Sequence, residues 1–419
     1  MTHRAADVAV GRTVAQHRQH ILSTLSPLPP VELPIAESLH RTLAEDLIAR
    51  VDVPGFDNSA MDGYALRHVD AASATPDAPV ALVVVADLPA GSPENPEIGA
   101  GETARIMTGA PLPTDADCVV PLEDTDEGTM TVGIRRAPAR AAHIRRAGSD
   151  VHVGDRVLTS GRRLHAQDLA AAASAGVDSL FVYPAPRVGV LSTGSELRPA
   201  GEALGRGQIH DSNSVLIAAA VAECGGIAVQ LGSVPDDEDA LRSLLERVTR
   251  AVDVVVTTGG VSVGAYDIVK AVLAPYGVWF GAVRMQPGKP QGFGAWIGVD
   301  GPPGVPIFAL PGNPVGAFIS FEQFVRPALL ALQGRSVVSR EVLQGVVSEG
   351  WSSPRDRVQF MPASVQWRPD RTLSVRPASG GGSGSFLVAS LAKANALAIV
   401  AESVTEVAVG DLVDVTVIR

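Results

Sequence analysis

The chain has 419 residues, more than one hydrophobic core usually supports, so we expect several domains. Its composition is globular, and its formal net charge of −11 argues against a general nucleic-acid-binding protein, which needs a basic face. The two cysteines, Cys118 and Cys224, form no CxxC pair, so they predict neither a disulfide framework nor a zinc site and suit a reducing cytosol.

The first 25 residues are rich in His, Arg and Gln and lack the continuous apolar segment of a signal peptide. They predict an amphipathic helix instead. The most apolar runs, such as APVALVVVA, are shorter than the roughly 18–20 residues needed to cross a bilayer. We therefore expect a cytoplasmic protein without a membrane segment.

Short β-type runs separated by Gly and Pro fill residues 51–147 and predict an inserted β-rich domain. Its first part, PGFDNSAMDGYAL (residues 54–66), combines turn residues, two carboxylates and apolar side chains. One interpretation is a structured loop whose Asp and Asn side chains cap its own backbone. The other is part of a functional site that needs partners from elsewhere in the chain.

Residues 148–185 contain a strand-turn element and then an Ala-rich helix, QDLAAAASAG. We expect this helix to pack on the N-terminal helix, so that residues 1–50 and 148–185 form one helical linker domain around the inserted one.

The pattern changes at Pro186, where strands begin to alternate with helices up to about residue 330. Helices of this length between strands predict a parallel, doubly wound sheet with helices on both faces. Ligands in such sheets bind beyond the carboxyl ends of the strands. Residues 331–419 return to β-type alternation and predict a small C-terminal β domain, in which we expect GGGSGS (residues 380–385) to form a tight turn.

Polar residues gather where the predicted α/β strands end. Glu196 follows RVGVLSTG, Asn313 lies in the Pro-flanked turn PGNP, and Lys289 lies in QPGKP before a further strand. The turn TTGGVSVGAYD contributes the glycines Gly259, Gly260 and Gly264, the hydroxyl of Ser262 and the carboxylate of Asp267. Each has a structural alternative, a helix cap or a tight turn, and the segment matches neither a P-loop nor GxGxxG. Their coincidence at several strand ends favours an anion-binding site.

Lysine usage supports this interpretation. The chain has three lysines, Lys270, Lys289 and Lys393, and its other basic residues are arginines. A compact ammonium between Gly and Pro at Lys289 suits contact with a phosphate or another oxyanion. Lys270 on a helix face shows that lysine is also retained elsewhere.

At this point the chain resembles the MoeA family, the molybdopterin molybdenumtransferases, over nearly its whole length. The resemblance rests on FDNSAMDGYA, IMTGAPLP followed by DCVVPLED, AGSDV, STGSEL, PDDEDAL, TTGGVSVGAYD, QPGKP and LPGNP, in the family's order, and on GSGSFLVASLAKANAL near the C-terminus. It implies an elongated, four-domain homodimer with a MogA-like α/β domain at its centre. The loop PGFDNSAMDGYAL would then supply acids across the subunit interface to the partner's strand-end pocket.

The implied reaction is insertion of molybdate into adenylylated molybdopterin with release of AMP, assisted by Mg²⁺. A molybdopterin adenylyltransferase is an implied partner. The implied catalytic residues are Asp62, Glu196, Asp236, Asp267 and Lys289, of which Asp62, Asp236 and Asp267 would hold the metal. The implied substrate-binding residues are Thr108, Asp150, Gly259, Gly260, Ser262, Gly264, Gln286 and Asn313.

Three positions depart from the family's usual pattern. Ser195 stands where many members have an acid, Gln286 stands where many have a lysine, and His40 replaces a frequent glycine. Arg284 is the base nearest to Gln286 in sequence. Ser195 and Gln286 keep open a non-catalytic molybdopterin-binding scaffold as an alternative, whereas His40 indicates a local structural change. A molybdopterin adenylyltransferase is the less favoured alternative, because VSVGAYDIV lacks the Arg and Thr of that sibling family.

Overall fold

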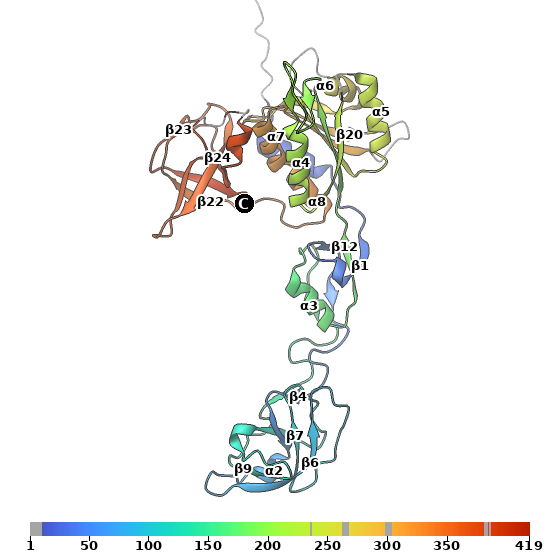
Figure 1. The fold of residues 1–419 in the computed structure, drawn as a ribbon, viewed down its shortest axis with the longest axis vertical. Helices are drawn as coiled ribbons and strands as arrows, with labels where there is room; N and C mark the ends of the chain where they lie inside the picture. The colour runs from blue at the N-terminus through green and yellow to red at the C-terminus, as the bar shows by residue number, and fades with distance from the viewer. Residues whose placement is uncertain (1–10, 235–236, 262–267, 298–303, 381–383, 385–386) are drawn as a thin grey trace, which may run out of the picture.

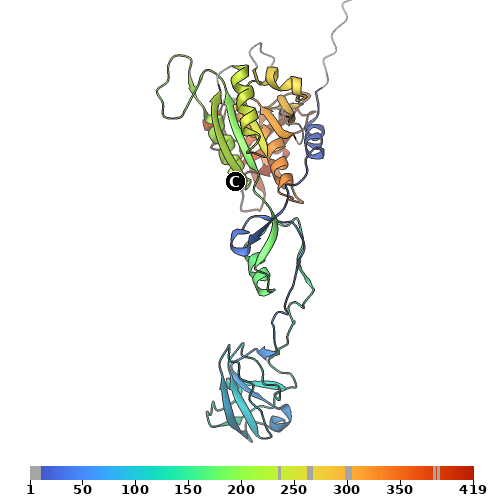
Figure 2. The same ribbon diagram turned by 90° about the vertical axis from the view of Figure 1, so that its right-hand side faces the viewer.

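The chain folds into an elongated molecule with two globular parts at one end, a small unit in the middle and a β-rich domain at the other end (Figure 1 and Figure 2). This computed structural model describes residues 11–234, 237–261, 268–297, 304–380, 384 and 387–419. The predicted fold class, a doubly wound α/β domain with an inserted β-rich domain and a small C-terminal β domain, is confirmed. The exact domain boundaries stay predictions.

The α/β domain is built on a six-stranded sheet in the order β16-β13-β17-β21-β20-β18. The strands are β16 (Ile227–Val234), β13 (Arg187–Thr193), β17 (Val254–Thr258), β21 (Val305–Leu310), β20 (Pro290–Trp296) and β18 (Trp279–Ala282). The first four are parallel, as predicted, but β20 and β18 are antiparallel. The connection between β18 and β20 is too short for the crossover that a parallel neighbour requires.

Helices cover both faces of this sheet. The helical segments are α4 (Ser212–Glu223), α5 (Glu238–Val248), α6 (Ile268–Leu273), α7 (Pro314–Ser320), the π-helical turn η4 (Phe321–Val325) and α8 (Arg326–Leu332). One apolar cluster joins α4, α7, η4 and α8 to one face, and a second joins α5 and α6 to the other. The continuous segment Pro314–Leu332 is long and apolar enough to cross a bilayer by length and composition, and 78% of its apolar window is buried inside the protein.

The N-terminal helix α1 (Val14–Ser23) packs on the α/β domain. Thr13 and Gln16 form a capping box at its start, and its buried side chains Val14 and Ile21 join the cluster that contains α8. The expectation that the Ala-rich helix packs on α1 is wrong. That helix, α3 (Ala166–Ser174), contacts the middle unit instead, because its buried Ala172 belongs to a separate core.

The middle unit connects the two ends of the molecule. It contains the sheet β1-β12-β2, the pair β11-β3 and the 3₁₀ turn η1. Its elements are β1 (Val31–Pro34), η1 (Ile35–Glu37), β2 (Thr42–Leu43), β3 (Leu47–Ile48), β11 (Arg156–Leu158) and β12 (Ser179–Tyr183). His40 lies in a turn here with φ of +66°, a left-handed conformation that explains why glycine suits this position.

The β-rich domain is a five-stranded sheet in the order β8-β5-β7-β6-β9. Its elements are β5 (Gly63–Leu66), α2 (His68–Ala71), β6 (Val80–Leu88), β7 (Glu102–Ile106), β8 (Cys118–Pro121) and β9 (Thr131–Ile134), with the short pair β4 (Asn58–Ser59) and β10 (Ile144–Arg145). Two apolar clusters pack against the sheet. The segment PGFDNSAMDGYAL forms structured turns and leads into β5, which lies between β7 and β8, and its part in a functional site stays a prediction.

The C-terminal domain is a small closed barrel, because β24 pairs with both β25 and β26. Its strands are β22 (Leu343–Val347), β24 (Val358–Trp367), β25 (Leu373–Pro377), β26 (Ala396–Val400) and β28 (Leu412–Val417). The two-residue strand β19 (Met285–Gln286) leaves the α/β domain and pairs with the start of β24. Most of the predicted GGGSGS turn lies outside the described residues.

Candidate functional site

The carboxyl ends of β13 and β17 meet in a buried polar network. The Oγ of Ser192 donates to Oδ1 of Asp211 at 3.0 Å and lies 3.0 Å from Oγ1 of Thr258. The same Asp211 oxygen accepts the backbone N–H of Ser214 at 3.0 Å and so caps α4. Asp211 therefore fixes the start of α4 at the edge of the sheet. Sequence reasoning missed it, although an acid directly before a helix is a capping signal.

The glycine turn after β17 is tight for a structural reason. Gly259 and Gly260 have φ of +93° and +66°. A Cβ on Gly259 would lie 2.7 Å from the carbonyl oxygen of Thr193, so no larger residue fits there. The Gly259 amide donates to the Leu310 carbonyl at 3.1 Å. This amide is engaged within the sheet edge and is not one of the free N–H groups that the sequence predicts for an anion.

The PGNP turn after β21 lies directly beside the glycine turn. A Cβ on Gly312 would lie 3.4 Å from Cα of Gly259. The Nδ2 of Asn213, at the start of α4, donates to the Gly312 carbonyl at 2.7 Å, while its Oδ1 is buried without a partner among the described residues. Asn313 is exposed at the start of α7 and makes no side-chain capping bond there. Its amide is therefore available at this edge.

The QPGKP turn reaches the same edge because β20 runs antiparallel to β21. The residues before β20 therefore lie beside the residues that follow β21. The buried Gln291 links this turn to α7: its Nε2 donates to the Gly288 carbonyl and to Oγ of Ser320, both at 2.6 Å. Gly288 has φ of +100°, and Lys289 is exposed. The turn thus presents a cation on a rigid support.

Gln286 and Arg284 contact the C-terminal barrel. Arg357, just before β24, donates from Nη1 to Oε1 of Gln286 at 3.2 Å. Arg284 is committed to an ion pair, with its Nη2 3.5 Å from Oε2 of Glu402. The cation beside Gln286 is thus Arg357, which sequence reasoning missed because it lies 71 residues further along the chain.

Glu196 is exposed just past β13. Gly194 has φ of +149°, and a Cβ there would lie 2.6 Å from Oε2 of Glu196, so the glycine leaves room for this carboxylate. The carbonyl oxygen of the exposed Ser195 accepts a hydrogen bond of 3.1 Å from Nη1 of Arg198. Because Ser195 stands where many family members have an acid, Glu196 is the carboxylate of this turn.

Four predicted site residues cannot be placed. Asp236, Ser262, Gly264 and Asp267 lie outside the described residues. In the rest of the chain, the structure groups no three His, Cys, Asp or Glu side chains in a way that could hold a metal ion. Among the described residues, the candidate strand-end site, which stays a prediction, consists of Glu196, Gly259, Gly260, Gln286, Lys289 and Asn313, with Arg357 in contact with Gln286.

A second polar cluster lies in the β-rich domain. Oδ1 of Asp62 accepts both the N–H and the hydroxyl of Thr108, each at 2.7 Å. These bonds lower the pKa of the exposed Asp62 carboxyl, so it is ionised at neutral pH. Asp57 accepts the Ala147 N–H at 2.8 Å and a guanidinium N–H of Arg146. Asp57 thus ties the loop to the chain that leaves the domain.

The middle unit separates the two clusters within one chain (Figure 1 and Figure 2). Asp62 and Thr108 belong to the β-rich domain, and Lys289 belongs to the α/β domain at the far end. Asp150 is exposed on the connection between the middle unit and the β-rich domain, where its N–H donates to the Val53 carbonyl at 3.0 Å. The predicted site residues thus form two groups that a single chain does not bring together.

The fold and the strand-end cluster define an α/β protein with polar and basic side chains at one edge of its sheet. Residues 12–176 match the MoeA N-terminal region (domain I and II), residues 189–331 a probable molybdopterin binding domain, and residues 344–418 the MoeA C-terminal region (domain IV). The chain is 39% identical over 406 residues to molybdopterin molybdenumtransferase 2 of Mycobacterium tuberculosis, covering 95% of this chain and 98% of that protein.

It is also 32% identical to molybdopterin molybdenumtransferase of Bacillus subtilis, covering 92% of this chain and 89% of that protein. A crystal structure of the molybdopterin biosynthesis MoeA protein from Pyrococcus horikoshii superposes with a TM-score of 0.82 at 30% identity, covering 98% of this chain and 99% of that one. The chain belongs to the MoeA family.

Proposed function

We propose that this protein is a molybdopterin molybdenumtransferase, which inserts molybdate into adenylylated molybdopterin and releases AMP. Its relatives over nearly the whole chain carry this name. The observation that carries the proposal is that two cations flank the QPGKP turn: Lys289 lies in it beside the end of β21, and Arg357 contacts its first residue, Gln286. Both substrates are oxyanions, and a sheet edge with fixed cations suits them.

Lys289 is the cation that we assign to the adenylyl phosphate. Its turn is fixed by Gln291 and Ser320, so a bound phosphate would not have to order the loop. The ammonium would balance charge that develops as the phosphoanhydride bond breaks. Glu196 and Asn313 lie at the neighbouring strand ends and would orient the substrate by hydrogen bonds.

Arg357 is the cation that we assign to molybdate. Many family members have a lysine where this chain has Gln286, and here the guanidinium of Arg357 touches that glutamine. A guanidinium offers several N–H donors in one plane, which suits a tetrahedral oxyanion. Gln286 would then hold Arg357 in position rather than supply the charge.

Mg²⁺ fits the donor chemistry of the proposed residues. Oδ1 of Asp62 is occupied by Thr108, but the carboxyl is ionised and its Oδ2 makes no hydrogen bond with the described residues. Hard carboxylate oxygens of this kind are what Mg²⁺ binds. We assign the other two metal-binding roles to Asp236 and Asp267. A bound Mg²⁺ would supply positive charge to the phosphoanhydride.

We also propose that the working form is a homodimer. Asp62, Thr108 and Asp150 cannot meet Lys289 within one chain, so a second copy would bring its β-rich domain to the strand-end site. The two-fold arrangement would create two equal shared sites. A cytoplasmic molybdopterin adenylyltransferase, which makes the substrate, is the enzyme with which we expect it to act.

The deciding experiment measures AMP released from adenylylated molybdopterin by the purified protein with and without molybdate. Release that depends on molybdate supports the proposal. Binding of the substrate without AMP release would indicate the alternative, a non-catalytic scaffold. Formation of adenylylated molybdopterin from ATP and molybdopterin would indicate an adenylyltransferase.

A further inference from the structure

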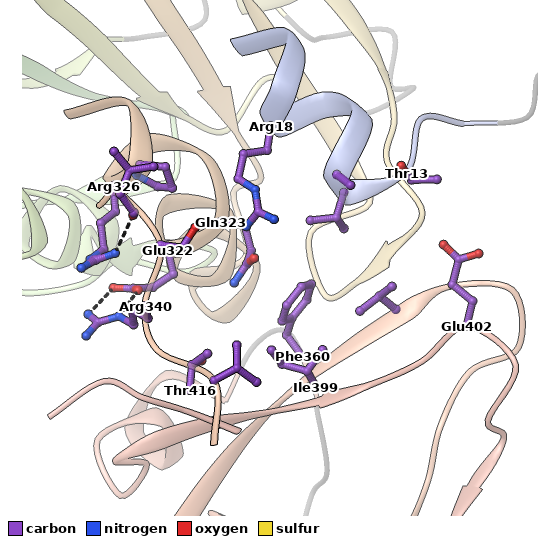
Figure 3. A pocket seen from close by; sticks show the side chains of 17 residues that line it. Thr13, Arg18, Glu322, Gln323, Arg326, Arg340, Phe360, Ile399, Glu402 and Thr416 are labelled. Carbon is purple, nitrogen blue, oxygen red and sulfur yellow. Dashed lines mark hydrogen bonds and ion pairs between the residues drawn. The ribbon is translucent and has the colours of Figure 1, made fainter. Parts of the chain in front are cut away.

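A cavity of about 370 Å³ lies at the junction of α1, the η4–α8 segment and the C-terminal barrel (Figure 3). Its walls come from three separate parts of the chain, residues 13–18, 322–342 and 358–416. The lower wall is apolar and includes Phe360 and Ile399. Pockets of a few hundred Å³ with an apolar wall and a few fixed polar groups are typical small-molecule sites.

Three arginines line this cavity: Arg18, Arg326 and Arg340. Its two carboxylates, Glu322 and Glu402, form no ion pair with the first two. Glu322 is only 5% exposed in its side chain, and it takes two hydrogen bonds from Arg340, at 2.7 and 3.1 Å. Glu402 is paired with Arg284, which lies outside the cavity lining. Among the described residues, each carboxylate thus forms its ion pair with an arginine other than Arg18 and Arg326.

The remaining cations are Arg18 and Arg326. Arg18 extends from α1 toward Gln323 and Phe360 (Figure 3) and makes no ion pair or hydrogen bond with the described residues. Arg326 is half-buried, and its Nη1 donates only to the Val338 carbonyl, at 3.2 Å. Burial and the nearby charge of Arg340 lower the pKa of Arg326, and the charge of Glu322 offsets this only in part. Half-buried cations in this situation favour an added anion.

We propose that this cavity binds a small organic oxyanion, a carboxylate or a phosphate ester, whose charge rests between Arg18 and Arg326 and whose carbon part packs on Phe360 and Ile399. Such a ligand would bridge α1, the α/β domain and the barrel. The cavity and the strand-end site lie on opposite faces of β24: Val358 and Phe360 face the cavity, whereas the preceding Arg357 contacts Gln286. The ligand would thus fix the strand that carries Arg357 without entering the strand-end site.

The test is isothermal titration calorimetry of the full-length protein with succinate, citrate, glycerol 3-phosphate and inorganic phosphate as separate probes. We expect saturable binding of one organic probe per chain, and binding about tenfold weaker in Arg18→Gln and in Arg326→Gln, because each loses a charge-assisted hydrogen bond. Arg368→Gln is the matched control. It changes an exposed barrel arginine whose Nη2 contacts Ser374, and it should bind as the wild type does.

The four probes also separate the two sources of the oxyanion. Binding of succinate or citrate would indicate a carboxylate ligand, and binding of glycerol 3-phosphate would indicate a phosphate ester. If inorganic phosphate binds as tightly as every organic probe, the apolar wall plays no part in binding, and the proposal is overturned. So would the absence of saturable heat up to about 10 mM, which corresponds to negligible affinity.

Arg18→Gln decides the question even if Arg326→Gln does not fold, because Arg18 lies on the surface of α1 and holds no other group. Unchanged binding in Arg18→Gln would overturn the proposal. Lys289→Ala locates the signal: retained binding places the ligand in this cavity, and lost binding places it at the strand-end site, which would also overturn the proposal.

Discussion

Arg357 of the C-terminal barrel and Gln286 of the α/β domain are joined by a hydrogen bond of 3.2 Å between Nη1 and Oε1. The two residues come from different domains, and the adjacent strands β19 and β24 pair in parallel at the same place. The barrel therefore contacts the segment that leads into the QPGKP turn, and Arg357 is the cation that it places there.

The first prediction concerns this cation. Arg357→Ala should raise the molybdate concentration needed for half-maximal AMP release about tenfold, because a charge-assisted contact is lost. The melting temperature should change little, since Arg357 is only half-buried. The control is Arg355→Ala, an exposed arginine two residues earlier. Adding Gln286→Lys to Arg357→Ala should restore part of the loss, and a double variant no better than the single one would count against this role.

The second prediction concerns Lys289. Lys289→Ala should weaken binding of adenylylated molybdopterin about tenfold with an unchanged melting temperature, because truncation of an exposed side chain opens no core cavity. Lys270→Ala changes an exposed lysine on α6 in the same domain and should have no effect. Fluorescence titration measures the affinity of both variants for adenylylated molybdopterin. If the two affinities are equal, Lys289 does not contact the substrate.

The third prediction tests the shared site. With adenylylated molybdopterin below its Kd, Asp62→Asn and Lys289→Ala should each retain about a tenth or less of the wild-type activity as purified homodimers. After mixing and subunit exchange, one of the two sites in each heterodimer is intact, so activity should return to roughly a quarter of wild type. Exchange can be verified by mass spectrometry of differently tagged subunits. No recovery despite complete exchange would contradict a site formed by two chains.

The fourth prediction concerns pH and stability. His17 is buried between Trp279 and Phe324, and burial, Arg12 and His20 together lower its pKa from 6.5 to about 3. A histidine that stays neutral when folded binds protons more readily when unfolded, so its protonation favours unfolding as the pH falls from 6.5 toward 3. Between pH 6.5 and 5 this should remove about 1–2 kcal/mol of stability.

Chemical denaturation of the wild type, His17→Phe and His143→Gln at pH 7 and pH 5 measures this effect. His17→Phe should lose less stability than the wild type over this interval, and the control His143→Gln, an exposed histidine of the β-rich domain, should behave as the wild type does. Identical pH dependence in all three proteins would show that His17 is not the responsible group.

The fifth prediction concerns Asp211. Asp211→Ala should lower the free energy of unfolding by about 2 kcal/mol, because it leaves the Ser192 hydroxyl and the Ser214 N–H without their acceptor. Asp237→Ala, which removes the cap of the more exposed helix α5, should cost about 1 kcal/mol. A smaller loss for Asp211→Ala than for Asp237→Ala would contradict the importance of the buried network.

The sequence predicted the elements whose signals are local. The β-branched runs of β13 and β17 and the capped helix α4 were each recognisable from a few residues. It did not predict the antiparallel direction of β20, because periodicity is the same for both directions. Lys289, Glu196 and Asn313 were identifiable from strand-end motifs, whereas Arg357 was not, because its place in the site depends on how the barrel docks.

The docking of α1 on α8 has a consequence for synthesis on the ribosome. Among the described helices α1 is made first, but the surface that covers its buried side chains Val14, His17 and Ile21 is complete only when the η4–α8 segment emerges roughly 300 residues later. At typical elongation rates this delay is roughly 15 to 60 s. The β-rich domain and the middle unit can complete their own cores during that time, while the α/β core stays open on one side. The helix α1 therefore completes the apolar core between it and α8 late in synthesis, although it is the first of the described helices to be made.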